Sequence, residues 1–177
     1  AVGDRVEAEI ENEESATAII SEILTRNNYI NRQSPRHKHQ HHIVASNLDQ
    51  SMLVATLKEP KTSQGFIDRF LVASEMYHVK PFIVFNKSDL YKAKELDKYA
   101  QWKAMYEAVG YKVFLISAEK KEGVDEVLEM LKNKTTLISG HSGVGKSSFL
   151  NVVFPDIKLK TQDVSGWSGK GQHTTTF

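Results

Sequence analysis

A glycine-rich loop between two apolar segments constrains the fold of this chain more than any other feature. Residues 135–140 read TTLISG, which is typical of a buried strand, and residues 140–147 read GHSGVGKS. The next residues, SSFLNVVF, suit a helix. The loop fits the pattern G-x-x-x-x-G-K-[ST], in which backbone N–H groups at the start of a helix surround a phosphate group. A strand, this loop and a helix in that order predict an α/β domain.

The positions of this loop have expected roles. Its glycines let backbone N–H groups close around a β-phosphate, and the helix start adds positive potential. Lys146 is expected to neutralise β- and γ-phosphate oxygens, and the Ser147 hydroxyl is expected to bind Mg²⁺. A ligand-free glycine-rich turn is the alternative, and the flanking strand and helix argue against it. The residues expected to bind nucleotide are Gly140, His141, Ser142, Gly143, Val144, Gly145, Lys146, Ser147 and Ser148.

Strand-like and helix-like segments alternate from residue 42 onward. Three of the strand candidates are nearly continuous apolar runs, as expected of strands buried on both faces of a parallel sheet. The pattern therefore predicts an α/β domain with a mostly parallel sheet. The expected strands are 42–46, 52–57, 81–86, 111–117 and 135–140, and the expected helices are 66–78, 94–109 and 124–132.

A second motif, NKSD, follows the apolar strand 81–86. The carboxylate of Asp89 can accept hydrogen bonds from N1–H and the exocyclic amine of guanine, which adenine cannot offer. Asn86 would tie the motif to the phosphate loop, and the stem of Lys87 would lie over the base. Ser88 completes the motif. Taken alone, these residues could equally form a turn at the end of a strand.

Two weaker signals complete a nucleotide pocket. Ser117 and Ala118 end the strand after NKSD, where a backbone N–H would meet the guanine carbonyl. The segment GKGQHTTTF, at 169–177, offers threonines in a glycine-rich context, as the Mg²⁺-binding switch I of a GTPase requires. His173 is a candidate for positioning the attacking water, and a plain surface histidine is an equal alternative. Candidate Mg²⁺ ligands are Ser147, Thr174, Thr175 and Thr176.

The order of these motifs is unusual. In an ordinary P-loop GTPase the phosphate loop opens the domain, whereas here NKSD precedes it by about fifty residues. A fold can be re-cut without changing its pocket when the old termini lie close together. Here the two base-binding segments come first, the phosphate loop follows, and the switch I candidate is last. This order predicts a circularly permuted GTPase domain over residues 42–177, which is incomplete at its C-terminal end.

Residues 1–41 are expected to be the end of a small β-barrel and a linker. Val2, Val6, Ala8 and Ile10 alternate with polar residues, as strand residues do. Residues 26–42 have no apolar period, and they are read as a solvated linker, as a strip that touches RNA phosphates, or as a metal-binding histidine tract. The residues concerned are Arg26, Arg32, Arg36 and Lys38, with His37, His39, His41 and His42.

Composition sets the outer limits. The sequence has 177 residues, a net charge of +1 and no cysteine, so neither a disulfide framework nor a thiolate zinc site can exist within these residues. No apolar run approaches the roughly 18 residues that span a bilayer. These features predict a soluble cytoplasmic protein without membrane partners. Both ends look like cuts, because Ala1 is not an initiator methionine and Phe177 follows no helix stop.

With these motifs in place, the chain resembles the RsgA (YjeQ) family of circularly permuted GTPases. VGDRV and ILTRNNYINRQS resemble the end of that family's OB-fold, and NKSDL, SGHSGVGKSSFLN and HTTT resemble its nucleotide motifs. The resemblance implies GTP hydrolysis to GDP, Mg²⁺ dependence, and a role in maturation of the small ribosomal subunit, with that subunit and its rRNA as partners. It implies a monomer without DNA partners, and a structural zinc only in a C-terminal domain outside this chain.

Two other classes of protein remain open at this point. One is an RNA-binding module that needs no nucleotide and carries a vestigial phosphate loop. The other is a P-loop ATPase or kinase acting on a small molecule. The intact Gly145, Lys146 and Ser147 argue against the first class, and Asp89 argues against both.

Overall fold

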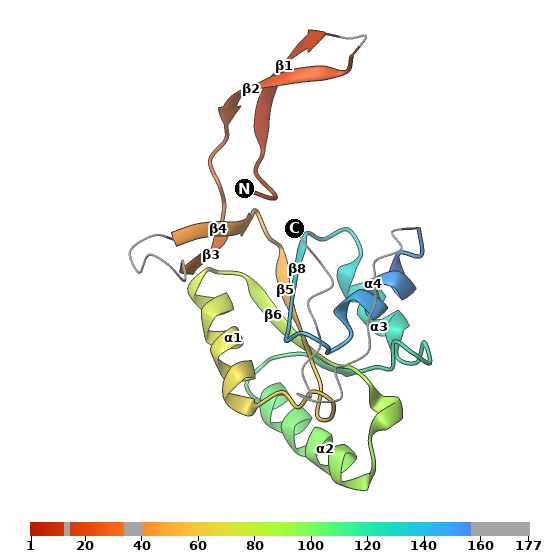
Figure 1. Ribbon diagram of the computed structural model, residues 1–177. Helices are drawn as coiled ribbons and strands as arrows, with labels where there is room; N and C mark the ends of the chain where they lie inside the picture. Colours follow the sequence, from red (N-terminus) through yellow and green to blue (C-terminus); the bar gives the residue numbers. More distant parts are fainter. Residues whose placement is uncertain (13–14, 34–40, 157–177) are drawn as a thin grey trace.

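A four-stranded parallel sheet forms the centre of the computed structural model, which describes residues 1–12, 15–33 and 41–156 (Figure 1). Its strand order is β7, β6, β5, β8. All six residues of β5 are buried, which explains its continuous apolar run. The mostly parallel α/β fold expected from the sequence is confirmed. The strands are β5 (Gln50–Ala55), β6 (Lys80–Phe85), β7 (Val113–Leu115) and β8 (Thr136–Ser139).

Helices cover both faces of this sheet because successive strand side chains point to opposite faces. Leu53 and Ala55 of β5 pack with α1 and α2, whereas Met52 and Val54 pack with α3 and α4. Figure 1 shows the two pairs of helices on opposite sides of the sheet. The helices are α1 (Gln64–Met76), α2 (Ala93–Ala108), α3 (Val124–Leu131) and α4 (Lys146–Val153), with a 3₁₀ turn, η1 (Ser88–Leu90).

Antiparallel strand pairs precede the sheet. β1 (Val6–Asn12) pairs with β2 (Thr17–Ile23) in a hairpin that projects away from the sheet (Figure 1). The strands expected in this part of the chain are therefore present, and the barrel to which they were assigned stays a prediction. Both strands are exposed along their whole length.

The strand expected at 42–46 lies outside the parallel sheet. It forms β4 (His41–Ser46), which pairs antiparallel with β3 (Tyr29–Gln33). Ala45 of β4 and Ile30 of β3 pack against Val79, just before β6. β4 therefore buries its apolar side chains against the amino end of the parallel sheet and not as a strand of that sheet. The expected boundary between residues 1–41 and 42–177 falls inside this strand pair, because β3 precedes residue 41 and β4 begins there.

The side chain of Arg26 belongs to the segment that was read as a solvated linker, an RNA-facing strip or a metal-binding tract, and it forms an ion pair with a carboxylate. Its Nε and Nη2 donate to the two oxygens of Asp4 at 2.6 and 2.8 Å. The guanidinium holds the pKa of the Asp4 carboxyl well below its usual range. Arg36, Lys38, His37 and His39 lie outside the described residues. Within the described ranges, no helix is long and apolar enough to cross a membrane, and no group of three His, Asp or Glu side chains could hold a metal ion.

Candidate functional site

The phosphate loop, the NKSD segment and the Ser117-Ala118 pair meet at one edge of the sheet. They follow β8, β6 and β7, whose carboxyl ends all lie at the same end of the sheet because the strands are parallel. This edge is where parallel α/β sheets place their ligands. The structure thus brings together all the expected site residues that lie within its described part. His173, Thr174, Thr175 and Thr176 lie outside the described residues.

Asn86 connects all three segments. Its Nδ2 donates to the carbonyl oxygen of Val144 in the phosphate loop at 2.9 Å, and its Oδ1 accepts from the backbone N–H of Ala118 at 3.0 Å. The side chain is 2% exposed, so it needs these partners. The tie from Asn86 to the phosphate loop is therefore present as expected. The backbone N–H of Ala118 donates to Asn86 because a buried amide oxygen requires a donor. The contact of a backbone N–H of the Ser117-Ala118 pair with a guanine carbonyl stays a prediction.

The phosphate loop approaches its neighbours so closely that two glycines are required. A Cβ on Gly140 would lie 2.3 Å from the carbonyl oxygen of Val54, and a Cβ on Gly145 would lie 2.4 Å from Nδ2 of Asn86. Gly145 also has φ +90°, which side chains rarely adopt. The loop then enters α4, so the backbone N–H groups of its first turn are available to an anion.

Lys146 lies folded against the loop from the first position of α4. Its Nζ donates to the carbonyl oxygens of Gly140 and His141, at 2.8 Å each. Burial lowers the pKa of this ammonium group. The cation is therefore held over the loop, where an incoming phosphate group would favour its charged form.

The NKSD segment is fixed to the Ser117 segment by side-chain and backbone bonds. The Ser117 hydroxyl donates to Oδ1 of Asp89 at 2.5 Å, and the backbone N–H of Ser88 donates to the carbonyl oxygen of Ile116 at 3.1 Å. Lys87, with φ +66°, starts the turn that presents Asp89 at the surface. The second oxygen of an exposed carboxylate, oriented by Ser117, can accept donors from a ligand.

Three contacts to the site come from residues that the motifs did not reveal. The Tyr91 hydroxyl donates to the carbonyl oxygen of Asn86 at 2.7 Å and accepts from the backbone N–H of Leu57 at 2.9 Å. Lys87 Nζ donates to the carbonyl oxygen of Glu59 at 2.6 Å. Phe66 of α1 stacks on His141, with ring centroids 3.8 Å apart. No signal in the sequence pointed to the loop after β5, because it contributes backbone groups that carry no motif.

Comparison with known proteins identifies the family. The RsgA GTPase family matches residues 23–177, most of the chain. The chain belongs to the RsgA GTPase family. A relative from Bacteroides fragilis, named small ribosomal subunit biogenesis GTPase RsgA, is 50% identical over 177 residues. A protein of the same name from Flavobacterium psychrophilum is 44% identical over 178 residues. Both alignments cover 100% of this chain, but the chain spans only 56% and 55% of those RsgA relatives.

Solved structures confirm the permuted RsgA fold. YjeQ from Thermotoga maritima is 37% identical and superposes with a TM-score of 0.75, covering 91% of this chain and 53% of that one. YloQ, described as a circularly permuted GTPase, is 33% identical with a TM-score of 0.67, covering 87% of this chain and 50% of that one. The order of motifs in this chain is therefore that of its family and not an accident.

The bridge made by Asn86 leads to a stability prediction. Asn86→Ala should lower the free energy of unfolding by about 2–5 kcal/mol, because it leaves a buried carbonyl of Val144 and the N–H of Ala118 unpartnered. Urea unfolding would measure this loss. Gln101→Ala removes an exposed amide from α2 and should change stability by less than about 0.5 kcal/mol. Equal effects of the two substitutions would contradict the bridging role.

Proposed function

We propose that this chain is the guanine-nucleotide site of a GTPase, which hydrolyses GTP to GDP and phosphate. The single observation that carries the proposal is the Asn86 bridge, which joins the NKSD segment to a complete phosphate loop. The names of the relatives support the same activity. Because the chain spans about half of those relatives, the activity belongs to the longer protein.

In this proposal the base lies against the NKSD segment. The carboxylate of Asp89 accepts from N1–H and the exocyclic amine of guanine, and the Lys87 stem covers the ring. Ser117 orients Asp89 through its hydroxyl. Adenine offers no matching donors, and it would leave the carboxylate desolvated and unpaired. Asn86, Ser88 and Ala118 shape this end of the pocket.

The phosphates lie in the loop from Gly140 to Ser148. Backbone N–H groups of the loop and of the first turn of α4 bind phosphate oxygens. Lys146 exchanges its carbonyl partners for β- and γ-phosphate oxygens. Water attacks the γ-phosphorus in line with the leaving oxygen, and positioning and charge neutralisation supply most of the rate enhancement.

Magnesium fits this arrangement without a cage of carboxylates. Mg²⁺ at nucleotide sites keeps several waters and is bound through few protein ligands together with phosphates. Ser147, at the second position of α4, provides the hydroxyl that such a site requires. When bound, Mg²⁺ would neutralise charge on the phosphates. Thr174, Thr175 and Thr176 are the proposed switch ligands, and His173 is the proposed residue for positioning water.

The proposed partner is the small ribosomal subunit, through its rRNA, and the proposed role is assistance in late maturation. The relatives' printed name, small ribosomal subunit biogenesis GTPase, supports this choice. We propose a cytoplasmic monomer that does not act on DNA or membranes.

Two measurements test the proposal. Titration with labelled GDP and ADP should show strong preference for GDP. The full-length protein should release phosphate from GTP slowly alone and faster with purified small ribosomal subunits. Equal affinity for GDP and ADP would favour a P-loop ATPase or kinase. Absence of nucleotide binding, with intact RNA binding, would favour a module with a vestigial loop.

A further inference from the structure

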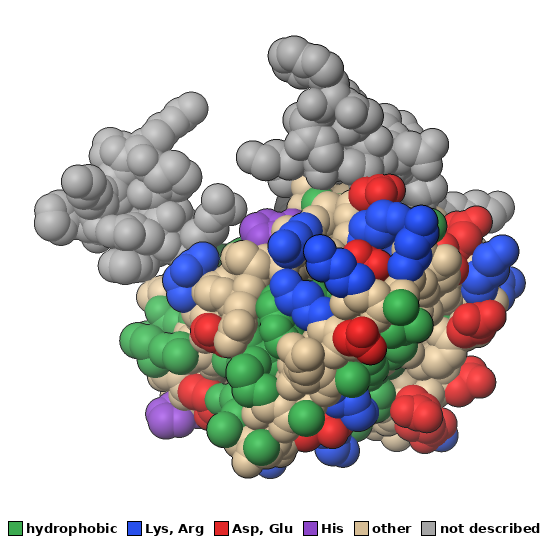
Figure 2. Space-filling model, turned by 90° about the horizontal axis from the view of Figure 1, so that it is seen from below, with side chains coloured by type: hydrophobic (Ala, Val, Ile, Leu, Met, Phe, Trp, Pro, Cys, Tyr) green, Lys and Arg blue, Asp and Glu red, His purple; other side chains and the backbone are tan. Residues whose placement is uncertain are grey.

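Lysine side chains gather beside the candidate site, on the loop after β5 and on α2. Lys58 and Lys61 lie in that loop, and Lys94 and Lys98 lie four residues apart on α2, so they share one helix face. Figure 2 views the molecule from below, where these elements lie in Figure 1, and shows Lys and Arg side chains clustered there. We call Lys58, Lys61, Lys94 and Lys98, together with Trp102, the lysine surface.

The charges of the lysine surface act on one another. Burial lowers the pKa of the Lys98 ammonium, and the positive charges of Lys61 and Lys94 lower it further. The backbone N–H of Lys92 lowers the pKa of Glu95, and the charges of Lys58 and Lys94 add to this effect. Like charges held this close repel, so a polyanion that neutralises them is favoured.

A shallow groove with an aromatic wall lies on the α2 part of this surface. It is lined by Lys94, Asp97, Lys98, Gln101 and Trp102. Lys98 Nζ lies 4.3 Å from the centroid of the Trp102 ring, and the centroid of that ring lies 6.1 Å from that of the buried Phe85. Cations that follow a groove beside a fixed aromatic ring are the combination that single-stranded nucleic acids bind.

Carboxylates near the surface are mostly engaged. Glu95 accepts the backbone N–H of Lys92 at 3.0 Å, and Glu59 lies 3.8 Å from Lys58. Asp97 lines the groove itself. Its negative charge repels a polyanion, so removing this charge should strengthen binding, whereas removing lysine charges should weaken it.

The loop that carries Lys58 and Lys61 is attached to the candidate nucleotide site. Its Glu59 carbonyl accepts from Lys87 Nζ, and its Leu57 N–H donates to Tyr91, which in turn donates to Asn86. A partner bound on the lysine surface would therefore contact the same loop that supports the NKSD segment.

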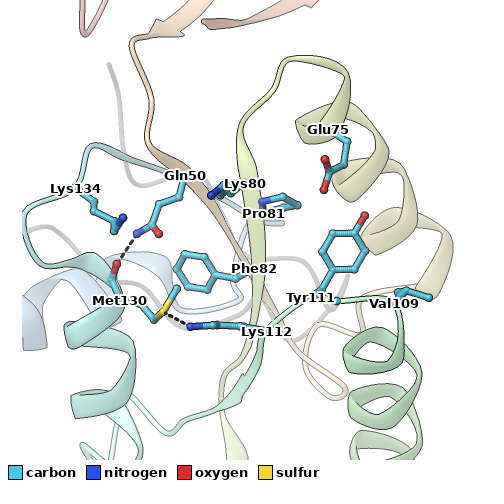
Figure 3. A pocket seen from close by; sticks show the side chains of 11 residues that line it. Gln50, Glu75, Lys80, Pro81, Phe82, Val109, Tyr111, Lys112, Met130 and Lys134 are labelled. Atoms are coloured by element: carbon cyan, nitrogen blue, oxygen red, sulfur yellow. Dashed lines mark hydrogen bonds between the residues drawn. The ribbon is translucent and has the colours of Figure 1, made fainter. Parts of the chain in front are cut away.

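A second group of lysines, at the opposite edge of the sheet, differs in its surroundings. Lys80, Lys112 and Lys134 line a pocket of about 470 Å³ over the Phe82 ring (Figure 3). The carboxyl ends of α1, α2 and α3 reach this pocket, and helix carboxyl ends carry partial negative charge. The helix ends favour lysines at this place without any nucleic acid, so these three lysines provide a control.

We propose that the lysine surface binds the phosphodiester backbone of RNA. The choice of RNA as the polyanion rests on the proposed function, whereas the surface itself rests on the charges and the groove. The RNA strand follows Lys58, Lys61, Lys94 and Lys98, and it covers the Trp102 ring. The lysine surface shares no residue with the segment 26–42, and the loop after β5 joins it to the NKSD segment.

Salt dependence tests this inference. Binding of the full-length protein to purified small ribosomal subunits, and to protein-free small-subunit rRNA, would be measured between 50 and 200 mM salt. Each phosphate contact contributes a slope of roughly 0.7–0.9, so losing four contacts should remove about a 50- to 150-fold change in affinity over this range. The variant is Lys58→Gln, Lys61→Gln, Lys94→Gln and Lys98→Gln combined. Its affinity for GDP should equal that of the parent.

Controls separate a local effect from a change in net charge. Lys80→Gln, Lys112→Gln and Lys134→Gln combined should leave the salt slope unchanged, and Asp97→Asn should tighten RNA binding. An unchanged slope in the four-lysine variant would overturn the inference while leaving GDP binding, and so the proposed function, intact. A slope that changes with whole subunits but not with protein-free rRNA would assign the surface to an acidic protein and would also overturn it.

Trp102 provides an independent readout. The chain has two tryptophans, and Trp167 lies outside the described residues. When protein-free small-subunit rRNA is added to the full-length protein, the change in tryptophan fluorescence should be smaller in Trp102→Phe than in the parent, and this difference should be lost at high salt. Equal changes in the two proteins at RNA concentrations that saturate binding would contradict contact at this groove.

Discussion

Asp89→Asn is expected to lose affinity for GDP and to gain affinity for the xanthosine nucleotide. In the proposed complex the Asp89 carboxylate accepts two hydrogen bonds from guanine, and charged bonds of this kind contribute about 1.5–3 kcal/mol each. The amide of asparagine keeps one acceptor and turns a donor toward the exocyclic amine of guanine. A loss of about 10²–10⁴-fold in GDP affinity should follow. Xanthine carries a carbonyl at C2, which accepts from that amide.

The structure adds a control for this experiment. Ser117 holds Oδ1 of Asp89 at 2.5 Å, so the substituted side chain keeps an orienting partner. Glu129→Gln removes an exposed carboxylate near the end of α3, at the other edge of the sheet, and should leave affinity for both nucleotides unchanged. Competition titrations with GDP, ADP and the xanthosine diphosphate would measure all three affinities. If Asp89→Asn binds GDP as well as the parent does, the NKSD segment is only a turn.

The parallel sheet and its motifs were predictable because each depends on local chemistry. Gly140 and Gly145 are required by close approaches within the phosphate loop, and the apolar run of β5 follows from burial on both faces. The start of α1 was placed at Phe66, two residues late, because the Ser63 side chain that caps it through the N–H of Phe66 carries no apolar signal.

Contacts between distant segments account for what could not be predicted. The pairing of β4 with β3 depends on Ala45 packing near Val79, which a single sequence does not reveal. Tyr91 joins Leu57 to Asn86 through a side chain that reads as core. The Ala118 N–H donates to the side-chain oxygen of Asn86, a contact between two segments that no motif indicates. Each of these depends on which polar groups become buried together, and only the folded chain settles that.

Lys146→Ala is expected to abolish GTP hydrolysis while leaving the fold nearly unchanged. The Nζ atom is held by two carbonyl oxygens of the loop that it would exchange for phosphate oxygens. Removing one preorganised group that stabilises the transition state typically costs about 10²–10³-fold in turnover, and this one also binds the ground state. Slow basal turnover would therefore fall below detection, and binding of the triphosphate should weaken more than binding of GDP, because only GTP has the γ-phosphate.

The thermal stability of Lys146→Ala shows whether a loss of turnover comes from the site or from the fold. The Lys146 side chain is only partly buried, and His141 is exposed, so water can reach the carbonyl oxygens that lose their donor. Thermal unfolding without nucleotide should therefore change little. Lys132→Ala, which removes an exposed lysine after α3, serves as the matched control and should retain normal turnover. Normal GTP turnover by Lys146→Ala would contradict the assignment of residues 140–148 as a phosphate-binding loop. Lost turnover with a large drop in unfolding temperature would instead assign Lys146 a structural role, because the loop would then depend on its two carbonyl bonds.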